Sequence, residues 1–463
     1  MRNKIIWLIP CLIIIVSLML RFNIILIFSL ALLSIIVCLL LSKKKEIRFL
    51  KTINVSNLSN QKTGILVGKK QNNIYLTDES KVLIIDKKSQ KDYLNSNINI
   101  ISSFSNKPNM IIIDPNRELY NENYDNLKKS KYEITSYNLS NTFIDVFKII
   151  TKKMYAVKDL ELKVNNIKGQ YVTADEIFLA YEDIRKEIKQ YKNDITKLID
   201  EFIICYYSSI EFLPLRYLLL TYIEKKIYTE KIVELTIDNV LEFFYEKSQD
   251  SVLKIRKYWS TAEDSEFNIK EEVTKLKVKN NDLLLVLNSL YKKTCVLKET
   301  IKNMKIIDLE GFYTPNQVIF ISGEDEGTLK LFLFLLNYTH IESDLFLLLN
   351  SNAFYEFTLD KLKVIHVMTE LKQVDGLDNY SVKIYRGKPV NENKKEILRL
   401  CKKELDEIED NDYDNIFNFL KLFDKLDIDK DEVLIINPRK GNVIINFDFP
   451  KKTNKLLLNY KKN

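Results

Sequence analysis

Residues 110–120 read MIIIDPNRELY, a short apolar run followed by two acidic residues, Asp114 and Glu118. Asp114 and Pro115 end the run, and Glu118 opens a stretch typical of a helix. Apolar runs of this length are typical of buried parallel strands, and parallel sheets carry ligand sites at the carboxyl ends of their strands. The segment therefore predicts a strand, a turn and a helix that bring Asp114 and Glu118 to the edge of a sheet, beside a ligand site.

Composition limits what this site can be. The chain has 463 residues, of which 46% are hydrophobic, enough for two or three domains with real cores. Its net charge of +7 is small for this length and gives weak support for nucleic-acid binding. The five cysteines show no CxxC spacing, so neither a disulfide framework nor a zinc site is predicted, and a reducing compartment fits.

Two apolar runs precede the rest of the chain, at residues 5–20 and 24–41. Each run is about long enough to cross a bilayer as a helix. No small-residue cleavage site follows the first run, which favours a retained hairpin over a signal peptide. Basic residues flank the outer ends of both runs, so the positive-inside rule places both termini in the cytoplasm. We therefore expect a transmembrane hairpin over 1–50.

The rest of the chain changes pattern twice. β-rich runs separated by polar turns fill residues 51–151, long helical periodicity fills 152–305, and strand-like runs return over 306–463. The strand-like runs of the first part are GILVG, NIYLT, KVLIID, MIIIDP and YEITSYNL. This pattern predicts an α/β domain whose sheet is divided in the sequence by an all-α domain.

These parts, in this order, resemble the TraG-like coupling proteins of type IV secretion and conjugation, which are membrane-anchored ATPases. The segment at 114–120 is similar to the family's DPKGELY motif: Asp114, Pro115, Glu118, Leu119 and Tyr120 match, and Asn116 and Arg117 replace Lys and Gly. MKIIDLEGFYTPNQVIFISGED and VLIINPRKGNVIINFDFP resemble the segment that leads back into the family's sheet and its last strands. The resemblance implies a RecA-like P-loop NTPase-type domain interrupted by an all-α domain, behind two transmembrane helices.

The expected phosphate-binding loop is missing. The family places a Walker A loop, GxxxxGK[ST], directly after the strand that corresponds to KVLIID. Such a loop needs glycines to wrap the phosphates, a lysine for the β and γ oxygens and a hydroxyl for magnesium. Here the chain continues with Asp86, Lys87, Lys88, Ser89, Gln90, Lys91 and Asp92, and no glycine occurs between Gly68 and Gly169. Lys91 lies near the required position, but the two aspartates would repel a phosphate.

The expected Walker B acids are missing as well. A Walker B strand ends in Asp-Glu, which hold magnesium and orient the attacking water. The matching strand here, DLFLLL, is followed by Asn350, Ser351 and Asn352. An amide and a hydroxyl supply neither the negative charge nor a base. Two such losses predict an inactive ATPase with no catalytic residues and no metal site, with ATP and magnesium as cofactors only if the degenerate site still binds them.

Other candidate sites have simpler explanations. The sequence from Gly323 to Thr328 has three carboxylates and the wrong spacing for a phosphate loop, so a helix start is expected. Residues 427–431 carry alternating aspartates but lack the glycine and glutamate of a calcium loop. His340 and His366 are too isolated for a metal site, and His366 is expected in the core.

The basic clusters KKSKYE and RKEIKQYKND are interleaved with acids. On helices such clusters usually form solvated faces with i,i+4 ion pairs. Trp259, in the helical part, is expected to pack in a core.

The sequence thus predicts a multi-pass plasma-membrane protein, with both termini cytoplasmic, that recruits a substrate or acts as a scaffold in a conjugative secretion system. The resemblance implies secretion-channel proteins, an active ATPase paralogue, and DNA or protein substrates as partners, in a homo- or hetero-oligomer. Two alternatives are an active ATPase with a non-standard nucleotide site that drives DNA transfer, and a membrane-tethered adaptor unrelated to secretion.

Overall fold

The computed structural model describes residues 50–70, 73–86, 90–166, 174–207, 211–230, 234–262, 267–307, 315–338, 344–351, 353, 355–359, 361–369, 379–385, 432–437 and 441–446. The predicted membrane hairpin falls within residues 1–49 and so lies outside this part of the chain. Among the described residues, no helix has both the length and the apolar character needed to cross a bilayer.

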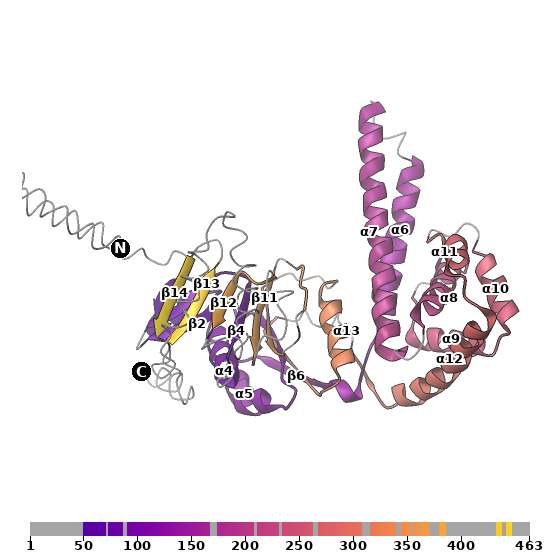
Figure 1. Ribbon diagram of the computed structural model, residues 1–463. Helices are drawn as coiled ribbons and strands as arrows, with labels where there is room; N and C mark the ends of the chain where they lie inside the picture. Colours follow the sequence, from indigo (N-terminus) through magenta and orange to yellow (C-terminus); the bar gives the residue numbers. More distant parts are fainter. Residues whose placement is uncertain are drawn as a thin grey trace, which may run out of the picture.

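A nine-stranded sheet forms the centre of the α/β body (Figure 1). Its strand order is β14-β13-β12-β4-β11-β10-β5-β9-β6, and the seven strands from β12 to β6 are parallel. The strands are β4 (Lys81–Ile85), β5 (Asn109–Ile113), β6 (Glu133–Asn138), β9 (Gln317–Ser322), β10 (Leu345–Asn350), β11 (Leu362–Met368), β12 (Val382–Tyr385), β13 (Glu432–Asn437) and β14 (Gly441–Asn446). This arrangement confirms the predicted α/β class and is compatible with a RecA-like domain.

Both faces of the sheet are buried, which explains the unbroken apolar runs. Alternate residues such as Ile111 and Ile112 belong to two different cores. Helices α4 (Gln90–Ile101) and α5 (Glu118–Lys129) cover one face, and α13 (Glu326–Leu336) covers the other. Strands β5 and β9, which are far apart in sequence, pair directly next to the edge strand β6.

Two of the expected strands belong elsewhere. The runs GILVG and NIYLT form β2 (Ile65–Lys70) and β3 (Asn73–Thr77), which pair antiparallel with each other in a separate sheet. β1 (Lys51–Asn54), which was not predicted, completes it. β13 and β14 are likewise an antiparallel pair rather than a continuation of the parallel sheet. In both pairs a short connection favours a hairpin over a parallel crossover.

Seven α-helices lie between β7 (Thr142–Ile144) and β8 (Lys305–Ile307) in the described chain. They are α6 (Phe147–Asn166), α7 (Ala174–Tyr207), α8 (Phe212–Glu224), α9 (Ile237–Ser248), α10 (Val252–Ser260), α11 (Ile269–Leu276) and α12 (Asn280–Ile301). The α6 and α7 pair projects well beyond the rest of the helical body in Figure 1. Trp259 is 2% exposed, which confirms its predicted place in the core.

β7 and β8 pair in parallel and form a two-stranded sheet of their own. Lys305, expected at the end of the all-α stretch, belongs to β8 because the segment pairs with β7 as the chain leaves the helices. The chain therefore enters and leaves the helical body at adjacent points.

Candidate functional site at the carboxyl edge of the sheet

The parallel strands bring residues from three distant segments to one edge. The Asp86 N–H donates to the carbonyl of Met368 at 3.0 Å, and the Ser351 N–H donates to the carbonyl of Val367 at 3.3 Å. β11 thus lies between the segment expected to replace the Walker A loop and the segment expected to replace the Walker B acids. The Asp114 N–H donates to Ile321 farther along the same edge, at 2.8 Å.

Lys91, the lysine nearest to the position of a Walker A lysine, is held by carboxylates. Its Nζ lies 2.9 Å from Glu118 Oε2 and 2.5 Å from Glu122 Oε1, both on α5. The hydrogen bonds that Lys91 donates to Glu122 and then to Glu118 raise the pKa of Lys91, and burial opposes them. The ammonium is therefore neutralised by the protein's own acids, where an ATPase would leave it for the phosphates.

The surroundings of Lys91 add further negative charge. Asp86 is 2% exposed at the end of β4, and Asp92 lies in the first turn of α4. The Asp92 carboxylate lies at the positive N-terminal end of α4 and complements the helix dipole there. A bound phosphate would need this same end of the helix. Lys87, Lys88 and Ser89 lie outside the described residues. The described residues of this segment do not fit a nucleotide phosphate.

The residues that match the family motif build a turn and a helix start. Asp114 Oδ2 accepts a hydrogen bond from the Tyr120 N–H at 2.8 Å. Burial raises the pKa of Asp114, and hydrogen bonds from the backbone N–H groups of 118–120 oppose that shift. The carboxylate thus accepts hydrogen bonds from backbone N–H groups in the first turn of α5, which usually bond to the side chain of the N-cap residue. Tyr120 packs edge-on against Phe320 of β9, with ring centroids 5.2 Å apart.

Arg117 stands where the family motif has glycine, and it keeps the backbone shape that a glycine would provide. Its φ is +60°, in the left-handed region that costs a non-glycine residue about 1 kcal/mol. The guanidinium lies 4.8 Å from the centroid of the Tyr120 ring, a contact that favours this arrangement. The turn therefore adopts the left-handed conformation with an arginine at this position.

A polar network between α4 and α5 was not predicted. Asn95 Nδ2 donates to Glu122 at 2.6 Å, and Asn123 Nδ2 donates to Asn95 at 2.6 Å and to the Leu119 carbonyl at 2.8 Å. Asn97, also buried, accepts from the Leu66 N–H at 2.9 Å. The sequence carried only part of this signal: Asn95 and Asn99, both buried, are four residues apart and share a face of α4, whereas Asn97 is two residues from each of them.

The segment after β10 is organised around a histidine. The Ser351 carbonyl lies 2.7 Å from His366 Nε2, and Tyr380 Oη lies 2.5 Å from His366 Nδ1. Burial lowers the pKa of His366 to about 4, so the ring is neutral, with the Nε2 proton donated to Ser351. The Ser351 Oγ accepts from the Ala353 N–H at 3.1 Å. This network confirms the predicted core position of His366.

No catalytic carboxylate comes from this segment. Asn350 is the half-buried last residue of β10, and Asn352 lies outside the described residues. Within the part of the chain that the structure describes, no group of three His, Cys, Asp or Glu side chains could hold a metal ion.

The acidic loop after β9 begins a helix, as predicted. Asp325 caps α13, since its Oδ1 accepts from the Thr328 N–H at 3.0 Å. Gly323 has a φ of +101°, and its N–H donates to the Pro115 carbonyl at 3.2 Å. The predicted solvated turn at 427–431 and His340 lie outside the described residues.

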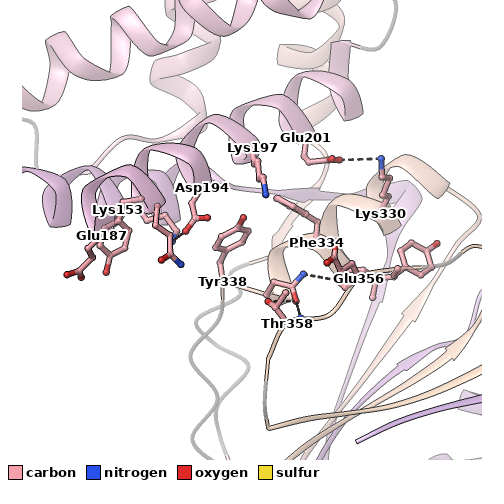
Figure 2. Close-up of a pocket in the computed structure, with 15 residues that line it drawn as sticks. Lys153, Glu187, Asp194, Lys197, Glu201, Lys330, Phe334, Tyr338, Glu356 and Thr358 are labelled. Carbon is pink, nitrogen blue, oxygen red and sulfur yellow. Dashed lines mark hydrogen bonds and ion pairs between the residues drawn. The ribbon is translucent and has the colours of Figure 1, made fainter. Parts of the chain in front are cut away.

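A polar cleft of about 870 Å³ lies away from this edge, between α7, α13 and residues 355–358 (Figure 2). Its charged side chains face one another across the gap: Glu201 of α7 lies 3.7 Å from Lys330 of α13. Deeper in the cleft, Lys153 Nζ lies 2.8 Å from Asp194 and within 5.1 Å and 4.7 Å of the ring centroids of Tyr191 and Tyr338. These contacts join the helical body to the end of α13.

Replacing Asp194 with asparagine is expected to destabilise the protein by about 1 to 2 kcal/mol, because Lys153 would lose its charged partner in a partly buried site. Glu187 lines the same cleft, is exposed and forms no ion pair with another described residue, so Glu187→Gln should change stability by less than about 0.5 kcal/mol. Chemical denaturation of both variants measures the difference. Equal effects would contradict the contact between Lys153 and Asp194.

Comparison with known proteins gives no further guide to the site. Neither the protein-family models nor the curated proteins contain a match to this chain.

Proposed function

We propose that this protein is a membrane-anchored, cytoplasm-facing relative of the coupling proteins of conjugative type IV secretion, and that it binds partners without hydrolysing ATP. The order of the parts supports this proposal: a predicted anchor, a parallel sheet compatible with a RecA-like domain, and a helical body inserted between two of its strands. The observation that carries the loss of activity is the pairing of Lys91 with Glu118 and Glu122.

This pairing matters because of what phosphate binding requires. A nucleotide would have to displace two carboxylates from Lys91 and then lie close to both of them, at a cost that grows as water is excluded. Across β11, Ser351 is committed to a turn and to His366. At the position expected for the Walker B acids, Asn350 and Ser351 supply no carboxylate to hold magnesium or activate water.

A coupling-protein relative without hydrolysis would work as a scaffold. It would dock on channel proteins, recruit a DNA or protein substrate, or occupy inactive positions in a ring with an active ATPase paralogue. The projecting pair of α6 and α7 adds surface for such contacts (Figure 1).

Calorimetric titration of the full-length protein in detergent with magnesium and ATP tests the proposal. We expect no saturable heat at ligand concentrations into the millimolar range and no phosphate release above a blank. The matched variant is Lys91→Ala, which should give the same flat titration, with unchanged circular dichroism because Lys91 is partly exposed. An active coupling ATPase is the positive control.

Saturable binding by the native chain that Lys91→Ala abolishes would overturn the proposal and would indicate a nucleotide site of unusual design. A flat titration together with no association between the purified protein and a channel protein or an intact coupling ATPase would instead favour a membrane-tethered adaptor unrelated to secretion.

A further inference from the structure

A second cavity lies on the opposite side of α7 from the cleft of Figure 2. Its volume is about 990 Å³, and it is bounded by α6, α7 and the first turn of α11 with the residues before it. Three cations of α7 line it: Arg185, Lys189 and Lys192. We call this cavity the α7 basic pocket.

The cations of this pocket belong to the RKEIKQYKND cluster, for which the sequence predicted i,i+4 ion pairs. Among the described residues, neither Arg185 nor Lys189 forms an ion pair, and both side chains are exposed. Lys189 has no acidic residue three or four positions away on either side, so its own helix cannot supply a partner. The described residues therefore give Arg185 and Lys189 none of the expected ion pairs.

The two acids that line the pocket have partners of their own. Glu272 lies 2.9 Å from Lys275 Nζ and accepts from Tyr217 Oη at 3.4 Å. Glu161 accepts a hydrogen bond from Tyr228 Oη at 3.2 Å. Within the described part of the chain, neither acid forms an ion pair with Arg185 or Lys189.

Arg185 is also held in place. Its guanidinium lies 4.5 Å from the centroid of the Tyr181 ring, one helical turn earlier. Stacking on a ring fixes the plane of the guanidinium and leaves its N–H groups free to bind a carboxylate with two parallel hydrogen bonds.

We propose that the α7 basic pocket binds an acidic peptide segment of a partner protein. An open cavity with one guanidinium stacked on Tyr181 and one or two ammonium groups suits a few carboxylates better than a nucleic-acid strand, which needs an extended basic track and free aromatic faces. Of the two aromatic side chains that line the pocket, Tyr181 and Phe267, the first is already in contact with Arg185. This inference rests on the proposed function in one respect, namely that the protein binds a partner protein. Its test uses no nucleotide, so it is independent of the nucleotide titration.

Fluorescence anisotropy of a labelled short peptide of alternating glutamate and glycine, titrated with the full-length protein, tests the proposal. We expect saturable binding that is weakened by salt and absent for the same peptide with glutamine in place of glutamate. Arg185→Gln combined with Lys189→Gln should weaken binding about tenfold, since two charge-assisted contacts are lost. Lys186→Gln removes one positive charge, half of what the double variant removes, from a neighbouring exposed position outside the pocket and should change the affinity less than about twofold.

Three results would overturn the proposal: no saturation with the acidic peptide, equal weakening by Lys186→Gln, or an oligothymidylate that binds more tightly than the peptide with the same dependence on Arg185 and Lys189. The last result would identify a nucleic-acid site. Unchanged thermal unfolding of the variants excludes loss of folding as the cause, and a flat nucleotide titration has no bearing on any of these outcomes.

Discussion

Replacing His366 with alanine is expected to lower the free energy of unfolding by about 3 to 5 kcal/mol. The ring is fully buried and bonds both Ser351 and Tyr380. Its removal would leave a buried carbonyl and a buried hydroxyl without this partner and would open a cavity between β11 and its neighbours. Urea unfolding followed by circular dichroism measures the loss.

The same histidine should make the protein sensitive to acid. Because burial lowers the pKa of His366 to about 4 from an ordinary value of 6.5, the unfolded state takes up a proton at a higher pH than the folded state does. The stabilisation is complete above pH 6.5 and is lost as the pH falls to about 4. The difference between the two pKa values corresponds to a loss of about 3 kcal/mol in the free energy of unfolding.

A pH series separates this contribution from other acid effects. In His366→Leu the part of the decline between pH 6.5 and 4 that comes from this ring should vanish. The rings next to His366 do not titrate in this range, because burial raises the pKa values of Tyr355 and Tyr380 above their ordinary range. A variant with the same slope as the native protein would show that His366 is protonated in the fold.

Replacing Gly323 with alanine is expected to cost about 2 to 4 kcal/mol. Its φ of +101° is strained for any residue with a side chain, and an added Cβ would lie 2.7 Å from Asn138 Oδ1. That oxygen caps the turn after β6 by accepting from the Ser140 N–H at 3.0 Å. The substitution would therefore disturb two neighbouring strand ends at the candidate site, and denaturant unfolding should detect it.

Gly327 provides the matched control for this substitution. It lies in the first turns of α13, where an added Cβ would meet Asp325 Oδ1 at 3.4 Å and nothing closer. Gly327→Ala should be neutral or should stabilise the protein by about 0.5 to 1 kcal/mol, because alanine favours helix. Equal losses for both variants would mean that the backbone at Gly323 is not under steric restraint.

The sequence predicts individual elements better than their partners. Apolar runs such as MIIIDP became strands because strands buried on both faces admit few polar residues. The runs GILVG and NIYLT resemble the strands of the main sheet in sequence, yet they pair with each other in a separate sheet. Partner choice depends on the connection: β2 and β3 are separated by two residues, a hairpin spacing that outweighed their resemblance to the other strands.

The candidate site follows the same rule. The absence of the Walker A glycines and Walker B acids at the expected spacing could be read directly from the sequence. The contacts of the remaining side chains could not be predicted from the sequence. The pairing of Lys91 with Glu118 and Glu122, for example, depends on how α4 and α5 pack side by side. Likewise, His366 and Ser351 are neighbours only because β10 and β11 pair in register.

The pairing of β7 with β8 has a consequence for how such a chain can change over evolutionary time. The helical body is an insertion in the chain of the sheet domain, and the pairing of β7 with β8 holds the two ends of this insertion next to each other. The entropy of closing a loop grows only slowly with its length, by about 0.6 kcal/mol for each doubling. Helices can therefore be gained, lost or exchanged between Ile144 and Lys305 while the register of the strands stays the same. Selection can therefore reshape the helical body without rebuilding the sheet.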